Sequence, residues 1–387
     1  MKADSADKLV KISSVIKEIY GDDLHKKRQL SIAYAAMGLL ASESLFLHRM
    51  AEGLVDTRGG NKKHAAKQID RLLSNKGVSV WDLSAPWVTY VLADHKEIMV
   101  ALDWTSFFDD EQSMLSLNIV TGKGIATPLL WKSADKKQPK HNRARYEDQL
   151  LSRLKTVLPA DVKVTLLADR GFADQKFFRF LDEELGFKYT IRIKSNTTII
   201  HKNIKNIKNK AANWLKPDGR SLGLKNAFIT LTEYPIKQFV AVKDKGMKAA
   251  WLLASNTNLK TSEIISSYSK RWKIEPFFRD LKDGRFGMGL EQTHIKSCER
   301  RDRLMLVLAL SYLLLVVLGQ AGEQIGFDKK LKVNTVKTRT HSLFRQGQFY
   351  YRFFFRFTQE EQDNLMQNFD NLLQQQGFWT DFFGDQK

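Results

Sequence analysis

The stretch VKVTLLADRGFADQKFFRFLDEELGFKYTIRIKS, residues 162–195, decides the fold class. It opens with VKVTLLA, an apolar run typical of a strand that is buried on both faces of a sheet. The following ADQKFFRFLDEEL is typical of a helix, and FKYTIRIKS is typical of a second strand. This order predicts a mixed sheet covered by helices, which is an α/β fold.

Further strand-like segments lie upstream of this stretch. They are closely spaced and rich in β-formers: WVTYVLAD (87–94), EIMVALDWTSF (97–107) and MLSLNIVTG (114–122). This pattern predicts an antiparallel meander. A helix is expected next, over RYEDQLLSRLKTVL (145–158).

Residues 196 to about 262 interrupt the alternation of strands and helices. HKNIKNIKNKAANWLK (201–216) contains five lysines and no acidic residue, and the strand-like FITLTEY, KQFVAVKD and KAAWLLASN follow it. We expect a β-rich insertion with a basic loop. Residues 261–283 then have a helical pattern, and 300–320 are expected to form a buried helix.

Both ends of the chain are expected to be helical. In the first 85 residues an apolar helical segment is followed by the turn TRGGN and the basic segment NKKHAAKQIDRLLSN. A short helix, a turn and a basic helix suit DNA binding, although a solvated charged helix face would look the same. We therefore divide the chain into a helical N-terminal DNA-binding domain (1–85), a catalytic domain (86–320) and a C-terminal helical region (321–387) that is a candidate for dimerisation.

Charge and cysteine usage limit the function classes. The chain has 387 residues, with 62 Lys and Arg against 43 Asp and Glu, a net charge of +19. Such an excess favours a polyanionic partner, nucleic acid before anionic membrane, over a merely soluble basic protein. Cys298 is the only cysteine, which excludes an intrachain disulfide and a cysteine-based zinc site and suits a reducing cytoplasm.

No membrane segment is expected. The N-terminal residues lack the apolar core of a secretory signal. The longest apolar run, LMLVLALSYLLLVVLG (304–319), has 16 residues, fewer than the ~20 needed to span a bilayer. A buried core helix is the better interpretation of this run.

The segment YSKRWKIEPFFRDLK, residues 268–282, contains a carboxylate among aromatic and basic side chains. A helix advances about 100° per residue, so Tyr268, Arg271, Glu275 and Lys282 would fall within about 60° of one face. A salt-bridged surface face could have the same pattern. Pro276 is a complication, because a kink there could move Lys282 off the common face.

Two other acids follow apolar strands. Asp103 follows IMVAL and Asp169 follows VTLLA, and a charge at the end of a buried strand is costly unless it is paired or bound to a metal. One such aspartate is most often a turn or cap residue. Together with Glu275, however, they make a set of three carboxylates, the ligands that Mg²⁺ prefers when it also binds phosphate oxygens.

These motifs resemble those of the IS4-family DDE transposases, which include the Tn5 and Tn10 enzymes. The segment 268–282 fits the family signature Tyr-x2-Arg-x3-Glu-x6-Lys at every position, while ALDWTSF and LLADRGFAD resemble the blocks that carry the two catalytic aspartates, here Asp103 and Asp169. The resemblance covers roughly residues 90–310. It implies an RNase H-like core with a β-strand insertion before the catalytic Glu275.

The resemblance also implies roles for basic and aromatic side chains. In the family, the signature residues corresponding to Tyr268, Arg271 and Lys282 contact DNA at the transposon end, and Arg170 lies beside the second aspartate. Trp251 resembles a tryptophan that stabilises a flipped base, with a core position on a strand as the alternative. Trp272 is expected in core packing or backbone contact. Three arginines after the signature could bind phosphates or form a solvated face: Arg300, Arg301 and Arg303.

The expected function is cut-and-paste DNA transposition. The resemblance implies two Mg²⁺ ions, replaceable by Mn²⁺, held by Asp103, Asp169 and Glu275. It further implies double-stranded DNA partners (terminal inverted repeats and target), a homodimer in the synaptic complex, and a prokaryotic cytoplasm. Two alternatives remain. One is an RNase H-like nuclease that does not transpose; the other is a non-catalytic DNA-binding inhibitor, which would lack an acid or part of the N-terminus.

Overall fold

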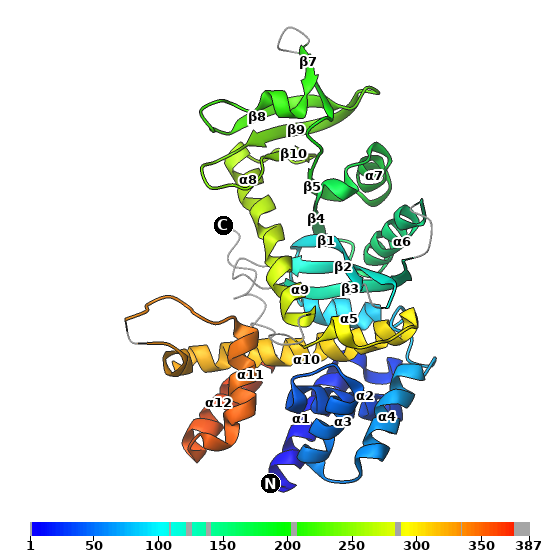
Figure 1. Ribbon diagram of the computed structural model, residues 1–387, viewed down its shortest axis with the longest axis vertical. Helices are drawn as coiled ribbons and strands as arrows, with labels where there is room; N and C mark the ends of the chain where they lie inside the picture. Colours follow the sequence, from blue (N-terminus) through cyan, green and yellow to red (C-terminus); the bar gives the residue numbers. More distant parts are fainter. Residues whose placement is uncertain are drawn as a thin grey trace.

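The computed structural model describes residues 2–107, 110–120, 126–136, 141–202, 207–282, 288–333 and 335–374. The chain forms an elongated molecule (Figure 1). Helices of the N-terminal part lie at one end, the first strands lie in the middle, and the strands of the predicted insertion lie at the other end. The mixed α/β architecture predicted from residues 162–195 is confirmed.

Ten strands of the described residues form one sheet in the order β3-β2-β1-β4-β5-β10-β9-β8-β6-β7. The first five are β1 (Glu97–Phe107), β2 (Gln112–Val120), β3 (Ala126–Asp135), β4 (Lys163–Ala168) and β5 (Lys188–Arg192). The other five are β6 (Thr198–His201), β7 (Ile207–Lys210), β8 (Leu222–Ile229), β9 (Tyr234–Val242) and β10 (Trp251–Ser255). Strand β4 lies between β1 and β5 and is parallel to both, and every other pairing is antiparallel.

The meander is present, but its membership was predicted wrongly. Residues 87–92 of the predicted strand belong to helix α5 (Ser84–Leu92), and the third strand is β3, which the sequence pattern did not single out. The buried residues of α5 are spaced as on a helix face, at positions 84, 87, 88, 91 and 92. Its β-branched and aromatic residues masked this helical spacing, and burial of one helical face outweighs their strand propensity.

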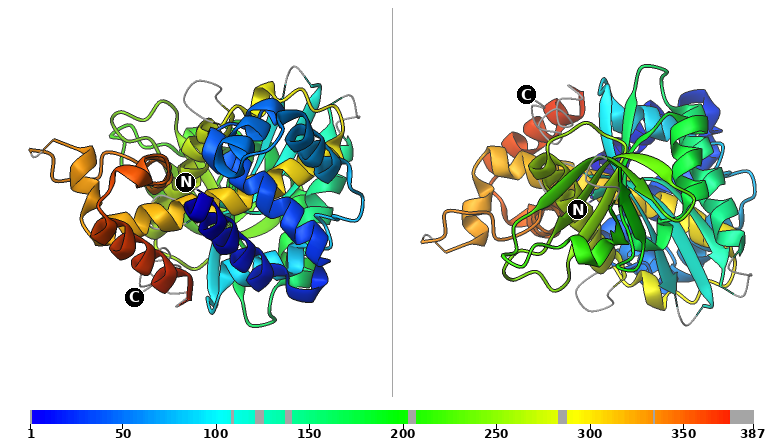
Figure 2. Two further views of the ribbon diagram at one scale, coloured as in Figure 1. Left: turned by 90° about the horizontal axis from the view of Figure 1, so that it is seen from below. Right: turned by 90° about the horizontal axis from the view of Figure 1, so that it is seen from above.

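Helices cover both faces of the sheet (Figure 1). Helices α6 (His141–Val157) and α7 (Gln175–Arg179) lie on one side, and a π-helical turn continues α7 to Leu185. Helices α8 (Thr261–Ser269) and α9 (Ile274–Lys282) lie on the other side. Figure 2 shows the same arrangement along the long axis.

Helix α10 (Cys298–Gln324) is the central support of the molecule, and its apolar stretch is wholly buried. By length and composition it could cross a membrane, but complete burial within the protein identifies it as the predicted core helix. Its first turns cover the edge strand β3. Asp302 Oδ1 accepts a hydrogen bond from the Ser133 backbone N–H (2.9 Å), and the Asp302 carbonyl accepts one from Trp131 Nε1 (3.1 Å). Burial raises the pKa of Asp302 to about 7.

The N-terminal helices are α1 (Lys2–Tyr20), α2 (Lys26–Ser42), α3 (Leu47–Arg58) and α4 (Lys62–Ser74). Helices α2 and α3 cross with their backbones in close approach, because a Cβ on Gly38 would lie 2.4 Å from the Met50 carbonyl oxygen. Asn61 caps α4, and its side chain accepts the Lys63 backbone N–H at 2.8 Å. The basic segment after TRGGN is therefore a well-capped helix.

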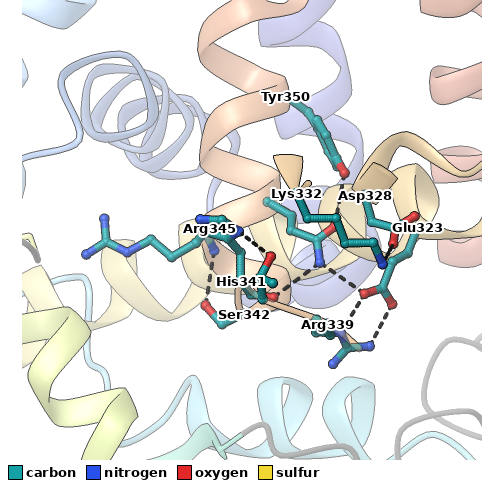
Figure 3. Close-up of polar contacts among 10 residues, drawn as sticks. Glu323, Asp328, Lys332, Arg339, His341, Ser342, Arg345 and Tyr350 are labelled. Atoms are coloured by element: carbon teal, nitrogen blue, oxygen red, sulfur yellow. Dashed lines mark hydrogen bonds and ion pairs between the residues drawn. The ribbon is translucent and has the colours of Figure 1, made fainter. Parts of the chain in front are cut away.

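The C-terminal helices α11 (Leu343–Phe353) and α12 (Gln359–Gln374) pack on α10 (Figure 1). Gly347 allows this crossing, since a Cβ there would lie 1.9 Å from the Leu315 carbonyl oxygen. The segment that leads into α11 is tied back to the end of α10: Arg339 Nη2 lies 2.6 Å from Glu323 Oε2 (Figure 3). Helices α11 and α12 agree with the expectation that this part of the chain is helical.

Candidate active site

The two aspartates lie side by side at the centre of the sheet. Strands β1 and β4 are parallel, and their last paired residues are Leu102 and Ala168. Asp103 and Asp169 directly follow these two residues in the sequence, and the backbones of adjacent strands lie about 4.8 Å apart. The expectation that Asp103 ends its strand was wrong, because β1 continues to Phe107 through its pairing with β2.

The environment of Asp103 favours a proton. Burial raises the pKa of Asp103 to about 6, Arg271 and the Trp104 N–H oppose this rise, and the nearby charges of Asp169 and Glu275 add to it. The Trp104 backbone N–H donates to Asp103 Oδ1 at 2.9 Å. Asp103 therefore feels the charges of both other carboxylates predicted from the sequence.

Asp169 has an under-satisfied side chain. Its Oδ1 is buried and has no hydrogen-bond partner among the described residues. The nearest cation is Arg192 at the end of β5, whose Nη1 lies 3.8 Å from this oxygen. Arg192 was not among the residues predicted for the site, although its position in the apolar strand FKYTIRIKS was a usable signal, because a charge in a buried strand needs a partner.

The signature segment is not one continuous helix. Helix α8 ends at Ser269, a 3-10 turn spans Lys270–Lys273, and α9 begins at Ile274. Pro276 lies in the first turn of α9, where its missing N–H costs little and its ring avoids a clash with a preceding α-turn. The chain therefore tightens before the proline. Glu275, in this first turn, is half-exposed.

Arg271 lies between two of the carboxylates. Its Nη1 is 3.8 Å from Asp103 Oδ2, and its Nη2 is 3.7 Å from Glu275 Oε1, while only 5% of its side chain is exposed. Its Nε has no hydrogen-bond partner among the described residues. The guanidinium predicted to hold a DNA phosphate is thus engaged by the carboxylates in this structure.

Two aromatic rings, Tyr268 and Trp272, contact the Arg271 guanidinium, and Trp251 packs against both rings. Tyr268 is fully buried, which is incompatible in this conformation with its expected contact to a phosphate, and burial raises its pKa to about 12. Trp251 is half-buried and makes an edge contact with Tyr268, at 5.1 Å between ring centroids. Trp272 stacks on Trp251 at 6.5 Å and is 41% exposed, so the expectation of core packing was wrong for Trp272. The 3-10 turn directs it outward.

Lys282 is held against β1. Its Nζ donates to the Ser106 carbonyl at 2.7 Å and lies 5.2 Å from the centre of the Phe107 ring. Burial lowers its pKa. The side chain is only half-buried, so its predicted contact with DNA stays a prediction.

Two of the arginines expected at phosphates are structural. Arg301 is fully buried, forms an ion pair with Asp110 and donates from Nε to Gln112 Oε1 at 2.7 Å. Arg303 is buried and donates from Nη1 to the last carbonyls of α4, at Leu73 (2.9 Å). In this conformation the burial of both side chains and their internal partners oppose a phosphate contact, which stays a prediction.

The other two basic candidates lie nearer the surface. Arg300 joins α10 to α4 through Asp70, with Nη2 at 2.7 Å from Oδ1. Arg170 is exposed beside Asp169. Their predicted DNA contacts stay predictions.

The site can be tested for its fit to divalent metal ions. Among the described residues, no group of three His, Cys, Asp or Glu side chains converges closely enough to hold one ion. Asp103 and Asp169 nevertheless offer adjacent carboxylates, and the unpartnered Asp169 Oδ1 is a hard oxygen donor aimed away from any protein hydrogen bond. These two aspartates are oxygen donors of the kind that divalent ions take, and Glu275 is paired with Arg271 in this structure.

Residues 133–314 match the family model described as Transposase DDE domain. This DDE-domain match covers a little under half of the chain; it includes Asp169 and Glu275 and begins downstream of Asp103. No curated protein matches the chain. The match supports a DDE transposase, an enzyme whose partner is DNA and whose class generally uses divalent metal ions.

Proposed function

We propose that this protein is a cut-and-paste DNA transposase of the IS4 family. The observation that carries the proposal is the register of β1 and β4, which sets Asp103 and Asp169 side by side, with Arg271 contacting both Asp103 and Glu275. The strand order β3-β2-β1-β4-β5, with β4 and β5 parallel to β1, supports an RNase H-like core. Strands β6–β10 then form the insertion that precedes Glu275.

In this proposal Asp103, Asp169 and Glu275 hold the divalent ions, Mg²⁺ or Mn²⁺. When bound, such ions activate the attacking oxygen and stabilise the leaving oxygen of a phosphodiester. Water first cleaves one strand at the element end and leaves a 3′-hydroxyl. That hydroxyl attacks the opposite strand to give a hairpin, water reopens the hairpin, and the same hydroxyl then joins target DNA.

Basic side chains outside the centre would position the DNA. Helix α4 exposes four residues along successive turns, namely Lys63, His64, Lys67 and Arg71. This face supports residues 1–85 as the part that binds terminal inverted repeats. The basic loop of the insertion adds exposed lysines at 202, 208 and 210, while Lys205 lies outside the described residues.

The remaining assignments belong to the same proposal. Residues 86–320 would form the catalytic domain, and 321–387 would contribute to a homodimer in the synaptic complex. The expected setting is the cytoplasm of a prokaryote, where the protein reaches chromosomal DNA.

The test is a reaction with DNA that carries the inverted repeats flanking the gene, a target plasmid and Mg²⁺. A transposase gives cleavage at the element ends and joined products. Cleavage without joining would contradict transposition and indicate a nuclease. Binding without cleavage at any metal concentration would contradict both and indicate a DNA-binding inhibitor.

A further inference from the structure

Two arginines reach the three carboxylates from different elements. Arg271, in the 3-10 turn before α9, contacts Asp103 and Glu275 at 3.8 and 3.7 Å. Arg192, at the end of β5, contacts Asp169 at 3.8 Å. Both side chains are largely buried, with 5% and 16% of their surface exposed. The carboxylate centre therefore carries its own internal cations.

These contacts are long for buried ion pairs. Charge-assisted N–H···O bonds are usually about 2.7–2.9 Å, so the two guanidinium groups neutralise the carboxylates without bonding them closely. Asp169 Oδ1 is buried and has no hydrogen-bond partner among the described residues, and Arg271 Nε donates no hydrogen bond of ordinary geometry, although the Arg271 guanidinium interacts with the Tyr268 hydroxyl. The charges of the carboxylates are thus balanced, but some of their hydrogen-bonding capacity is unused. Such a site can exchange its present contacts for closer ones.

The position of Arg271 conflicts with shared metal binding. A divalent ion held by Asp103 and Glu275 would need the oxygens that now face Nη1 and Nη2 of Arg271. Two cations repel each other strongly at such distances in a partly buried site. The Arg271 guanidinium also lies beside the surface: it is 5.1 Å from the centre of the Trp272 ring, and Trp272 is exposed.

Arg192 is less free to move. Its Nη2 donates to the Ala250 carbonyl at 3.0 Å, which ties the side chain to the residue before β10. It meets a single carboxylate. Any competition between Arg192 and an ion should therefore be weaker than that of Arg271.

We propose that Arg271 competes directly with a divalent cation for Asp103 and Glu275, with Arg192 as a fixed counter-charge for Asp169. Binding of the ion displaces the Arg271 guanidinium toward Trp272 and the surface, where it becomes available to a DNA phosphate. Arg271 is in this sense a positioning residue that links ion binding to DNA binding. The inference rests on the proposed function, because that function makes the carboxylates metal ligands.

The experiment measures Mn²⁺ binding to the full-length protein without DNA, by calorimetry. Removing a competing cation tightens binding, so Arg271→Gln should lower the Mn²⁺ dissociation constant about tenfold. Arg271→Lys keeps a cation and should stay near wild type. Arg192→Gln should tighten binding by less than Arg271→Gln. Arg220→Gln is the matched control, because it removes the same charge from an exposed residue of the insertion, which pairs with Asp218.

A second readout separates competition from general loosening of the site. By reciprocity, Mn²⁺ should strengthen DNA binding in the wild type and do so much less in Arg271→Gln. Circular dichroism and melting curves identify any variant that fails to fold, and for that case Arg271→Met gives the same charge removal with a stem of similar apolar character.

The outcomes are distinct. If Arg271→Gln binds Mn²⁺ no more tightly than Arg220→Gln does, while the wild-type protein binds Mn²⁺ and cleaves element ends, this inference alone is overturned. A wild-type protein that neither binds Mn²⁺ nor cleaves element ends overturns the proposed function, and the inference with it.

Discussion

Two buried arginines, Arg301 and Arg271, show how differently the same side chain is used in two regions of the molecule. Arg301, in the first turn of α10, bonds Gln112, pairs with Asp110 and donates to the Ile295 carbonyl at 3.0 Å. Arg271, at the carboxylate centre, meets its carboxylates only at 3.7–3.8 Å, and its Nε has no hydrogen-bond partner among the described residues. The difference separates a support of the fold from a group whose partners are expected to change.

The comparison also explains why the sequence alone did not reveal the structural role of Arg301. Both residues stand among charged and apolar neighbours, and both were expected at DNA phosphates. Burial alone does not distinguish them either. The two arginines differ in how many of their guanidinium N–H groups donate hydrogen bonds, and this depends on partners that are distant in sequence.

The largest expected effect concerns Arg301. Arg301→Ala should lower the free energy of unfolding by about 3–5 kcal/mol, because it leaves Asp110 buried without its partner. Arg271→Gln should cost only about 1 kcal/mol, since its ion pairs are long. Denaturant titrations measure both. Replacing both partners, as Arg301→Met with Asp110→Leu, should restore most of the loss, and equal losses for the two single variants would break the comparison.

The next effect concerns Asp302, which lies beside Arg301 in the chain. Its pKa is raised to about 7 by burial, so the folded state holds this proton more tightly than the unfolded state. Stability should therefore fall as pH rises from about 4 to about 7, by on the order of 2–3 kcal/mol after allowance for partial exposure. Asp302→Asn can still accept the Ser133 N–H, and should flatten this slope. Loss of stability of the Asn variant at pH 8 would show instead that the ionised form is required.

A smaller effect is expected at Trp251, which packs between Tyr268 and Trp272. Base stacking on an aromatic ring contributes about 1–3 kcal/mol, so Trp251→Ala should slow hairpin formation about 5- to 150-fold relative to first-strand nicking. A time course of nicked, hairpin and blunt products measures this ratio. If nicking and hairpin formation slow equally in a well-folded variant, Trp251 supports the fold of the aromatic cluster and has no role in stacking.

The smallest effect distinguishes exposed from buried arginines. Arg170→Gln should reduce the slope of log K against log salt concentration for DNA binding by about one unit, as for loss of one phosphate contact. Arg303→Gln should leave this slope unchanged, because Arg303 donates to backbone carbonyls of the protein. Binding isotherms at several salt concentrations give both slopes. A reduced slope for Arg303→Gln would place it at the DNA after all.

Much of the fold was predictable because periodicity and burial agree in the central elements. Residues 97–107 form β1, and the apolar run 304–319 lies within the buried α10. Residues 87–94 were not predictable as a helix from propensity, since Trp, Val, Thr and Tyr all favour strands. Their buried positions show the helical spacing only once the core is known.

At the site, the three carboxylates were predictable from type and order, but their surroundings were not. The spacing of Tyr268, Arg271 and Glu275 suggested one helix face, whereas the 3-10 turn before Pro276 buries Tyr268 and turns Trp272 outward. Arg192 comes from a different strand than any motif residue. Contacts of this kind follow from the sheet order, which local sequence does not encode.

The most direct measurement of the central claim is strand cleavage by carboxylate variants that still bind DNA. Asp103→Asn, Asp169→Asn and Glu275→Gln should each lose cleavage of element-end DNA by at least about a thousandfold, more than ~4 kcal/mol in the barrier, with binding largely kept. Arg220→Gln should cleave as the wild type does. Cleavage at near-wild-type rate by any one of the three variants would show that its carboxylate does not serve the reaction, and would contradict the three-carboxylate account of this site.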